Sequence, residues 1–165
     1  MDQTLRNASE QGNVDGLYLS IARDPNVLEK MDEIPFVDTP LHVAAAAGQT
    51  EFAMEMMMLK PSFARKLNPN GFIPLLLAMN SNNTLLVRKL LHVHRDLVCA
   101  QGRGDVNPLH YAAQKGKLLL LVEFLRICPK SIEYVTSQDK IALYVALKND
   151  MFDAFVLLVG WLWRA

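Results

Sequence analysis

The motif that decides the fold occurs twice, as Thr39-Pro40-Leu41-His42-Val43-Ala44-Ala45 and as Asn107-Pro108-Leu109-His110-Tyr111-Ala112-Ala113. The two stretches lie 68 residues apart, which is twice 34. A degenerate copy starts at Ile73, halfway between them, and another starts at Ile141, 34 residues after the second. Self-similarity at a fixed period of this size is typical of repeat proteins, in which each copy is one packing unit.

Two further observations extend the repeat over the whole chain. A weaker copy near the N-terminus lies at an offset of 36 and aligns Leu5, Ala8 and Gly12 with Leu41, Ala44 and Gly48. The first four copies also share a place after the second apolar stretch, which holds Pro25, Pro61, Arg95 and Pro129. The sequence therefore predicts five copies in one register.

Each copy predicts a pair of short helices. The first helix begins at the motif, where Thr39 is a good N-cap and Pro40 loses no needed hydrogen bond at the first helical position. Gly48 and Gly116 are expected to end this helix in a left-handed conformation, which glycine adopts without steric cost. Asn82 takes this place in the third copy.

The second helix of each copy is the bulkier one. We expect it over residues 52–58, 85–91, 118–125 and 151–158, with proline ending it where one follows. The linking stretches 68–71 and 102–105 are rich in turn residues. The prediction is ten helices in five pairs, without a sheet beyond short pairings between loops.

The predicted fold class is all-α, with about five stacked helix-turn-helix units. A single unit cannot bury its apolar face alone, so stacking makes a continuous core and the chain is expected to form one domain, residues 1–165. The approximate units are 1–36, 37–70, 71–104, 105–138 and 139–165.

The composition narrows the classes of function. The 17 basic residues balance 17 acidic ones, which argues against a nucleic-acid binder and against a polybasic membrane-surface binder. The N-terminus lacks the apolar core of a signal peptide, and the apolar run 154–163 is shorter than the roughly twenty residues that span a bilayer. Two cysteines do not make a disulfide framework. These features favour a cytoplasmic protein in a reducing compartment.

The motif together with its helix-turn-helix pattern resembles the ankyrin repeat, over roughly residues 4–163. A narrower resemblance links residues 34–45, residues 59–69 and Gly160-Trp161-Leu162 to plant ankyrin-repeat proteins of the "bian da" and "accelerated cell death" type. That resemblance implies a protein-interaction scaffold in plant immune or cell-death signalling, acting at the cytoplasmic face of the plasma membrane through relatives or partners. Members of that family carry further repeats and C-terminal membrane helices, which we expect this chain to lack.

Partner contacts are expected where the copies differ, because repetition holds the framework while loop positions vary. The varying positions lie just before the motif and just after its alanine pair. The candidate partner-contact residues are Phe36, Asp38, Asn70, Phe72, Arg103, Val106, Gln114, Lys115, Gln138 and Lys140. Phe36 and Phe72 have two interpretations, either as binding hot spots near loop tips or as rings that fold back onto the core.

A second set of residues is expected to act structurally. These are Thr39, Pro40, His42, Gly48, Pro108, His110 and Gly116. We expect His42 and His110 to hydrogen-bond the neighbouring backbone and the hydroxyl of threonine, and so to tie one unit to the next.

Catalytic, cofactor and metal sites are not expected. His92-Val93-His94 could chelate a metal, but a second ligand pair at metal-site spacing is missing. We expect Cys99 and Cys128 to be small buried hydrophobes. The methionines at 54 and 56–58 are expected to pack in the core with at least one exposed.

The C-terminal helix is apolar on every side, and a helix of that kind is normally buried. We therefore expect it to self-associate or to receive additional repeats in a longer protein. The identity of a protein partner does not follow from the sequence, and neither nucleic acid nor a small-molecule substrate is expected. Two alternatives stay open: a membrane-associated regulator that acts through a missing C-terminal segment, and an enzyme whose site assembles from distant residues.

Overall fold

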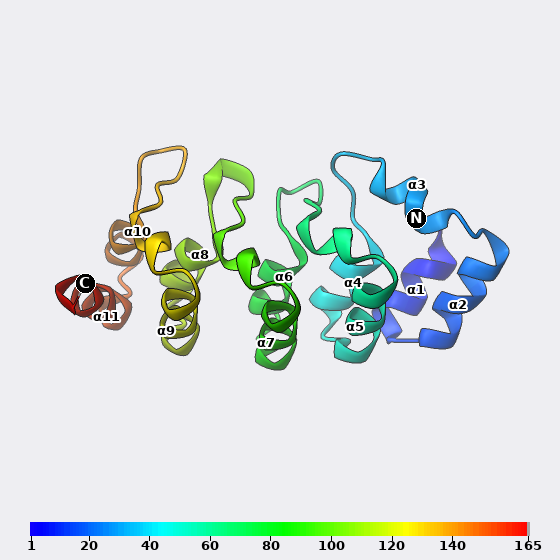
Figure 1. Cartoon of the computed structure of the whole chain (residues 1–165), viewed down its shortest axis with the longest axis horizontal. Helices are drawn as coiled ribbons and strands as arrows, with labels where there is room; N and C mark the ends of the chain where they lie inside the picture. The colour runs from blue at the N-terminus through cyan, green and yellow to red at the C-terminus, as the bar shows by residue number, and fades with distance from the viewer. Residues whose placement is uncertain (165) are drawn as a thin grey trace. The chain divides into compact units, whose positions relative to one another are not determined.

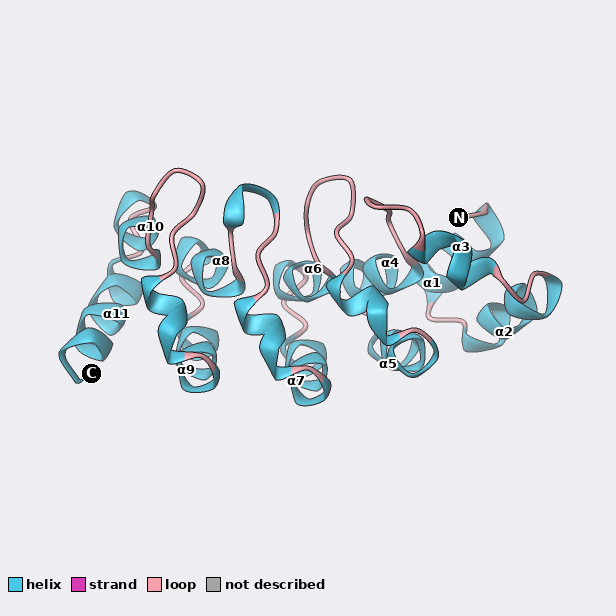
Figure 2. Ribbon diagram, turned by 45° about the horizontal axis from the view of Figure 1, so that its top comes forward, coloured by secondary structure: helices cyan, strands magenta, loops and turns pink. Residues whose placement is uncertain are grey.

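The computed structural model describes residues 1–164 and shows an all-helical chain (Figures 1 and 2). These residues form eleven α-helices and four short 3-10 helices, and their only β-type pairing is an isolated parallel bridge between Phe36 and Leu67. The chain divides into two compact units, Met1–His94 and Arg95–Ala165. The prediction that all five copies form one domain stays a prediction.

The first compact unit contains three copies of the repeat. Its elements are α1 (Gln3–Gln11), α2 (Val14–Arg23), α3 (Val27–Asp32), α4 (Pro40–Ala47), α5 (Thr50–Leu59), η1 (Pro61–Arg65), α6 (Pro74–Asn80) and α7 (Thr84–Val93). The first helices of successive copies stack on one another, because α4 packs against both α1 and α6. Each of them also packs against the second helix of its own copy.

The second compact unit repeats this arrangement. Its elements are η2 (Arg95–Cys99), η3 (Arg103–Asp105), α8 (Pro108–Lys115), α9 (Leu118–Ile127), η4 (Pro129–Glu133), α10 (Ala142–Lys148) and α11 (Phe152–Arg164). Helix α10 packs against α8 and α11, and α9 packs against α8, η2 and η4. The predicted helix pairs are thus present in both units, with ends that differ from the predicted ones by a few residues.

The left-handed residues confirm the register of the repeat. Within residues 1–164, the first helix of every copy is followed by one residue with φ between 58° and 76°, namely Gly12, Gly48, Asn82, Gly116 and Asp150. At Gly48 and Gly116 this conformation lets the next amide return to the helix: Gln49 N donates to Ala44 O at 2.9 Å, and Lys117 N to Ala112 O at 3.0 Å.

The prediction of ten helices was wrong by one, because α3 is an additional α-helix. The equivalent segments after the later copies are 3-10 helices. Helix α3 buries Leu28 and Met31, which lie three positions apart on one helical face. Its six residues are too few for a periodic pattern to reveal it.

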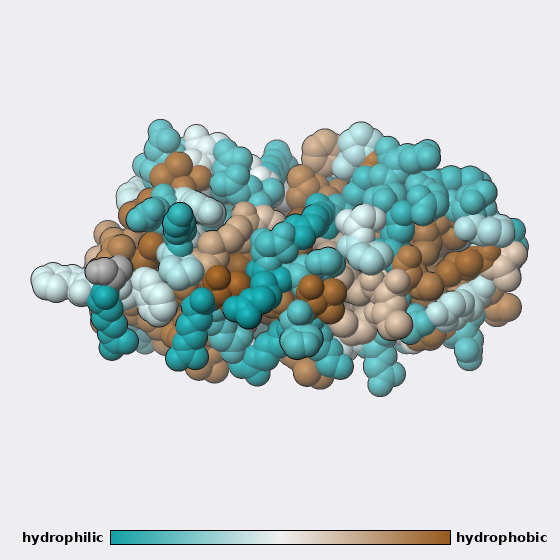
Figure 3. All heavy atoms as spheres, viewed as in Figure 1, coloured by the Kyte–Doolittle hydropathy of each residue, from teal (hydrophilic) through white to brown (hydrophobic). Residues whose placement is uncertain are grey.

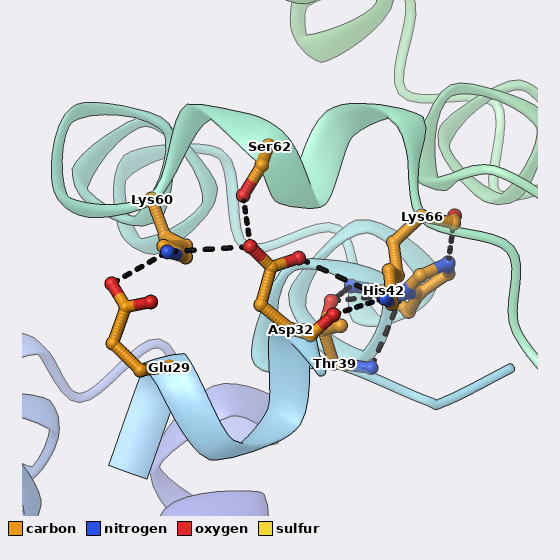
Figure 4. A network of polar contacts seen from close by, with 7 residues as sticks. All are labelled: Glu29, Asp32, Thr39, His42, Lys60, Ser62 and Lys66. Atoms are coloured by element: carbon orange, nitrogen blue, oxygen red, sulfur yellow. Dashed lines mark hydrogen bonds and ion pairs between the residues drawn. The ribbon is translucent and has the colours of Figure 1, made fainter. Parts of the chain in front are cut away.

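A network of charged side chains holds α3 against η1 (Figure 4). Lys60 Nζ lies 2.6 Å from Glu29 Oε1 and 3.3 Å from Asp32 Oδ2. Ser62 Oγ donates to Asp32 Oδ2 at 2.8 Å, and Lys66 Nζ donates to the backbone carbonyl of Asp32. Burial opposes ionisation of Asp32, but the hydrogen bonds from Ser62 and Lys60 outweigh it and lower the pKa of this carboxyl. The ion pairs therefore fasten a segment that has little apolar surface of its own.

The core is built from aliphatic side chains and three fully buried phenylalanines, Phe52, Phe63 and Phe124. In the view of Figure 3, hydrophilic side chains cover much of the surface and hydrophobic ones form separate patches between them. The methionine cluster behaves as predicted, since Met56 and Met57 are buried while Met58 is 79% exposed.

Helix α11 is incompletely covered. Ala154 and Leu158 are buried, whereas Phe152, Val156, Leu162 and Trp163 are exposed, Trp163 by 86%. Within residues 1–164, no helix combines the length and the apolar character that crossing a bilayer requires.

The two cysteines differ from the expectation of unpaired buried thiols. Cys99 ends η2, Cys128 directly follows α9, and these two elements pack together. The two residues form a disulfide with a Cα–Cα distance of 6.8 Å, and both are half-buried. The pairing depends on the packing of η2 on α9, which the spacing of the two cysteines does not reveal.

We predict that the disulfide stabilises the chain only under oxidising conditions. Cys99→Ser should lower the free energy of unfolding by about 3–4 kcal/mol without reductant, because the bridge closes a long loop in the unfolded chain. Chemical denaturation of both proteins with and without dithiothreitol measures this. With the thiols reduced, wild type and variant should unfold alike; an equal difference in both conditions would contradict the prediction.

Candidate functional site

Three loops of the chain share one hairpin-like geometry, at residues 68–72 in the first compact unit and at 102–106 and 136–140 in the second. In each loop the amide of the first residue donates to the carbonyl of the last at 3.0 Å. The amide of the fourth residue returns to the carbonyl of the first at 2.8–3.0 Å. The fourth residues, Gly71, Asp105 and Asp139, are left-handed. The loops therefore repeat with the same 34-residue period as the helices.

The side chain of the first loop residue adds to this geometry in two of the loops. Asn68 Oδ1 accepts from the amides of Asn70 and Phe72, both at 3.0 Å. Thr136 Oγ1 accepts from the amides of Gln138 and Lys140, both at 3.3 Å. These contacts shape the loop tips through short local hydrogen bonds, so the remaining side chains of each loop are left for other contacts.

His42 joins its own helix to the next loop of the first unit (Figure 4). Its Nδ1 accepts from the amide of Thr39 at 3.2 Å and lies 2.8 Å from Thr39 Oγ1. Its Nε2 lies 3.0 Å from the carbonyl oxygens of both Lys66 and Phe72. Because a backbone amide can only donate, Nδ1 must be the acceptor, and Nε2 carries the proton that is donated to the carbonyls.

His110 has the same role in the second unit. Its Nδ1 accepts from the amide of Asn107 at 3.1 Å, and its Nε2 donates to the carbonyl of Tyr134 at 2.8 Å. Asn107 Oδ1 in turn accepts from the amide of His110 at 2.9 Å, which completes a reciprocal cap. Each histidine thus holds the start of its helix and the base of the following loop together.

Burial lowers the pKa of both imidazoles below the ordinary histidine value, although their hydrogen bonds to backbone carbonyls act in the opposite direction. Desolvation of the charged form is the larger effect. Both histidines are therefore neutral at pH 7, which agrees with their hydrogen-bond geometry.

A groove of about 320 Å³ lies in the second unit, between the loops 102–106 and 136–140 and the helices α8 and α10. Its lining combines apolar side chains, amides and two lysines. The lining residues are Gly104, Val106, His110, Gln114, Thr136, Ser137, Gln138, Lys140, Tyr144, Val145, Lys148 and Asn149. Ser137 N donates to Gly104 O at 2.8 Å and so joins the two loops.

The first unit has a groove of about 390 Å³ at the corresponding register. Its charged lining residues are Arg6, Glu10 and Asp38. Arg6 Nε lies 3.3 Å from Glu10 Oε1, and Arg6 also pairs with Asp38 Oδ2 at 3.4 Å. The charges of this groove therefore neutralise one another largely within the groove.

The structure brings together four of the ten predicted contact residues in the second groove: Val106, Gln114, Gln138 and Lys140. Asp38 lines the groove of the first unit. The other five, Phe36, Asn70, Phe72, Arg103 and Lys115, are exposed but line neither groove. Phe36 is 59% and Phe72 36% exposed, so the two rings do not fold back onto the core.

Sequence reasoning missed several lining residues. Lys148 and Asn149 lie 34 residues after Gln114 and Lys115, so the repeat register alone could have selected them. Tyr144 occupies the histidine place of its copy but is exposed at the groove. Its role depends on the neighbouring loop, since Lys140 Nζ lies 4.4 Å from the centre of its ring.

The residues predicted to act structurally lie at helix ends. Thr39 and Asn107 are the N-caps of α4 and α8, Pro40 and Pro108 occupy their first turns, and Gly48 and Gly116 follow their last residues. Within residues 1–164, there is no group of three or more histidine, cysteine or acidic residues that could hold a metal ion.

Comparison with known proteins gives two relatives, and no family model matches the chain. The chain is 49% identical to the Ankyrin repeat-containing protein BDA1 of Arabidopsis thaliana over 71 residues, which are 43% of this chain and 17% of that protein. It is 29% identical to the Ankyrin repeat-containing protein C6C3.08 of Schizosaccharomyces pombe over 125 residues, 73% of this chain and 50% of the yeast protein. The chain thus spans half or less of each relative.

We predict that His110 stabilises the fold in its neutral form. His110→Ala should lower the free energy of unfolding by roughly 1–3 kcal/mol, because the buried carbonyl of Tyr134 loses its donor. Urea denaturation at neutral pH measures this, and an unchanged midpoint would contradict it.

The same measurement has a predicted pH dependence. Because the unfolded chain binds protons near the ordinary histidine pKa of about 6.5 and the folded chain does not, stability should fall as the pH drops below that value. His110→Gln should reduce this loss while His42 still contributes. A wild-type stability that rises on acidification through this range would overturn the prediction.

Proposed function

We propose that this chain, an ankyrin-repeat protein by its fold and its sequence similarity, is a scaffold that binds another protein in the groove of its second compact unit. The observation that carries the proposal is the origin of the lining residues. Val106, Gln114, Gln138 and Lys140 come from places that vary between the copies, while His110 and the left-handed residues around them belong to the repeated framework.

The chemistry of the groove supports a polypeptide ligand. Amides of Gln114, Gln138 and Asn149 can donate to and accept from a peptide backbone, and Val106 and Val145 offer apolar contact for a side chain. A groove with this mixture suits a segment of chain better than a compact apolar molecule, for which pockets are predominantly hydrophobic.

The groove can be tested by filling it. Gln114 and Asn149 are both exposed, so Gln114→Trp/Asn149→Trp should fold normally while obstructing the groove. A photo-crosslinking amino acid at Gln138 would capture bound proteins from cells of the source organism. We expect specific proteins to crosslink to wild type and to be depleted about tenfold with the filled groove, as for loss of a binding hot spot.

The matched control places the same tryptophans outside the groove, as Arg126→Trp/Lys130→Trp on α9 and η4. This control should keep the captured proteins. If no protein depends on the open groove, or if both variants lose the same proteins, the proposed binding site is wrong.

The cellular setting that we propose is plant immune or cell-death signalling at the cytoplasmic face of the plasma membrane. Its support is the resemblance of residues 34–45 and 59–69 to the plant family, together with the identity to the Arabidopsis protein over 71 residues. Expression in leaves of the wild type and of the filled-groove variant should change the extent of cell death differently. Equal responses to both proteins would count against this setting.

A second surface favours self-association. Phe152, Val156, Leu162 and Trp163 expose apolar side chains on α11, and patches of that kind on a folded protein mark interfaces. We expect the 165-residue chain to form dimers through this helix, and Val156→Asp/Trp163→Asp to shift it to the monomer. Size-exclusion chromatography with light scattering measures the mass, with Asp153→Asn as the matched control on the same helix. A wild type that is monomeric at all concentrations would contradict this expectation.

A further inference from the structure

The charged side chains that line the groove of the second unit all have the same sign. They are Lys140 and Lys148, with neutral His110 beside them, and no acidic side chain is among the lining residues. Within residues 1–164, neither lysine forms an ion pair. The two lysines are therefore cations whose charge is not neutralised by the chain itself.

The corresponding positions in the first unit show that the repeat does not require these charges. Lys140 is equivalent to Asp38, two copies and a further 34 residues earlier, and Lys148 is equivalent to Ala46. Asp38 and Ala46 also line a groove, but there the single cation, Arg6, is held by Glu10 and Asp38. The positive charge of the second groove is a property of that groove and not of the framework.

The position of Lys140 is well defined. Its backbone amide donates to Thr136 Oγ1, and its Nζ lies over the ring of Tyr144 at 4.4 Å from the centroid. Stacking on an aromatic face restrains an ammonium group without neutralising it, so the group can still bind an anion. Lys148, one helical turn after Tyr144 on α10, supplies the second cation of the same groove.

The surroundings add further positive charge and some negative charge outside the lining. Lys115 follows the lining residue Gln114, and its Nζ lies 5.7 Å from the ring centre of Tyr111, while Arg103 is exposed in the loop 102–106. The nearest acidic residues in the sequence, Asp105 and Asp139, occupy left-handed positions in the two loops and do not line the groove.

We infer that the ligand of this groove is an extended peptide segment that carries glutamate or aspartate side chains spaced to meet Lys140 and Lys148. This inference rests on the proposed function and names the partner's chemistry. Carboxylates complement the two unpaired ammonium groups, the lining amides bind the peptide backbone, and Val106 and Val145 receive an apolar side chain between the acidic ones. Lysines present point charges and not the planar fork of arginine that suits bidentate phosphate binding, so carboxylate is the better match.

The probe is a fluorescein-labelled heptapeptide with four glutamates around a central leucine and glycine at both ends. Fluorescence anisotropy would compare it with a counterpart in which glutamine replaces glutamate and with one in which phosphoserine does. We expect the glutamate peptide to bind the full chain about tenfold tighter than the glutamine peptide at low salt, and to lose this advantage at high salt because exposed charges are screened.

The variant that tests the two cations is Lys140→Gln/Lys148→Gln, and Arg126→Gln/Lys130→Gln is its control with the same change in net charge. The first should bind the glutamate peptide about tenfold more weakly than wild type, and the control should bind it as wild type does. Thermal unfolding of both variants ensures that each is folded.

The outcomes separate this inference from the proposed function. Equal binding of the glutamate and glutamine peptides, or an undiminished affinity of the Lys140→Gln/Lys148→Gln variant, would overturn the acidic-peptide inference. Tight binding of the phosphoserine peptide alone would overturn it in favour of a phosphate ligand. If crosslinked proteins still depend on the open groove in either case, the scaffold function stands and only the chemistry of its ligand is wrong.

Discussion

The hydrogen bonds of two buried histidines support the loops that surround both grooves. In each case one imidazole nitrogen accepts from the N-cap amide of its own helix, and the other donates to the backbone at the base of the next loop. A carbonyl buried without a donor costs free energy, so the side chain satisfies the backbone at two places that lie 24 residues apart. Only a neutral imidazole can do this, because it needs one nitrogen as acceptor and one as donor.

The copies that lack this histidine show how the repeat is adapted. Leu76 stands in the histidine place of the third copy and is buried, so it contributes apolar packing instead of a hydrogen bond. Tyr144 stands there in the fifth copy, where it is exposed and lies under Lys140. A framework position of the repeat has thereby become part of the groove surface. The last copy of the described chain can diverge in this way because its loop, 136–140, is already held from below by His110 through Tyr134.

Most of the secondary structure could be predicted, because caps, prolines and left-handed residues act over a few neighbours in the chain. The exceptions depend on distant partners. Helix α3 has six residues, and its charged side chains are satisfied by Lys60, Ser62 and Lys66 about 30 residues later. Cys99 and Cys128 meet because η2 packs on α9. Neither contact leaves a periodic signal, so the pattern of the sequence could not reveal them.

The sequence by itself determined the 34-residue period, the pairs of helices and the places at which the copies differ. Half of the predicted contact residues lie in the two grooves, since those places recur at the same loop and helix ends. The tertiary structure alone decided which of them share a groove, because Gln114 and Lys148 meet only when α8 packs against α10. It also decided the electrostatic character of each groove. Arg6 pairs with acidic neighbours, whereas Lys140 rests on an aromatic ring that leaves its charge intact, and this difference depends on the packing around each side chain.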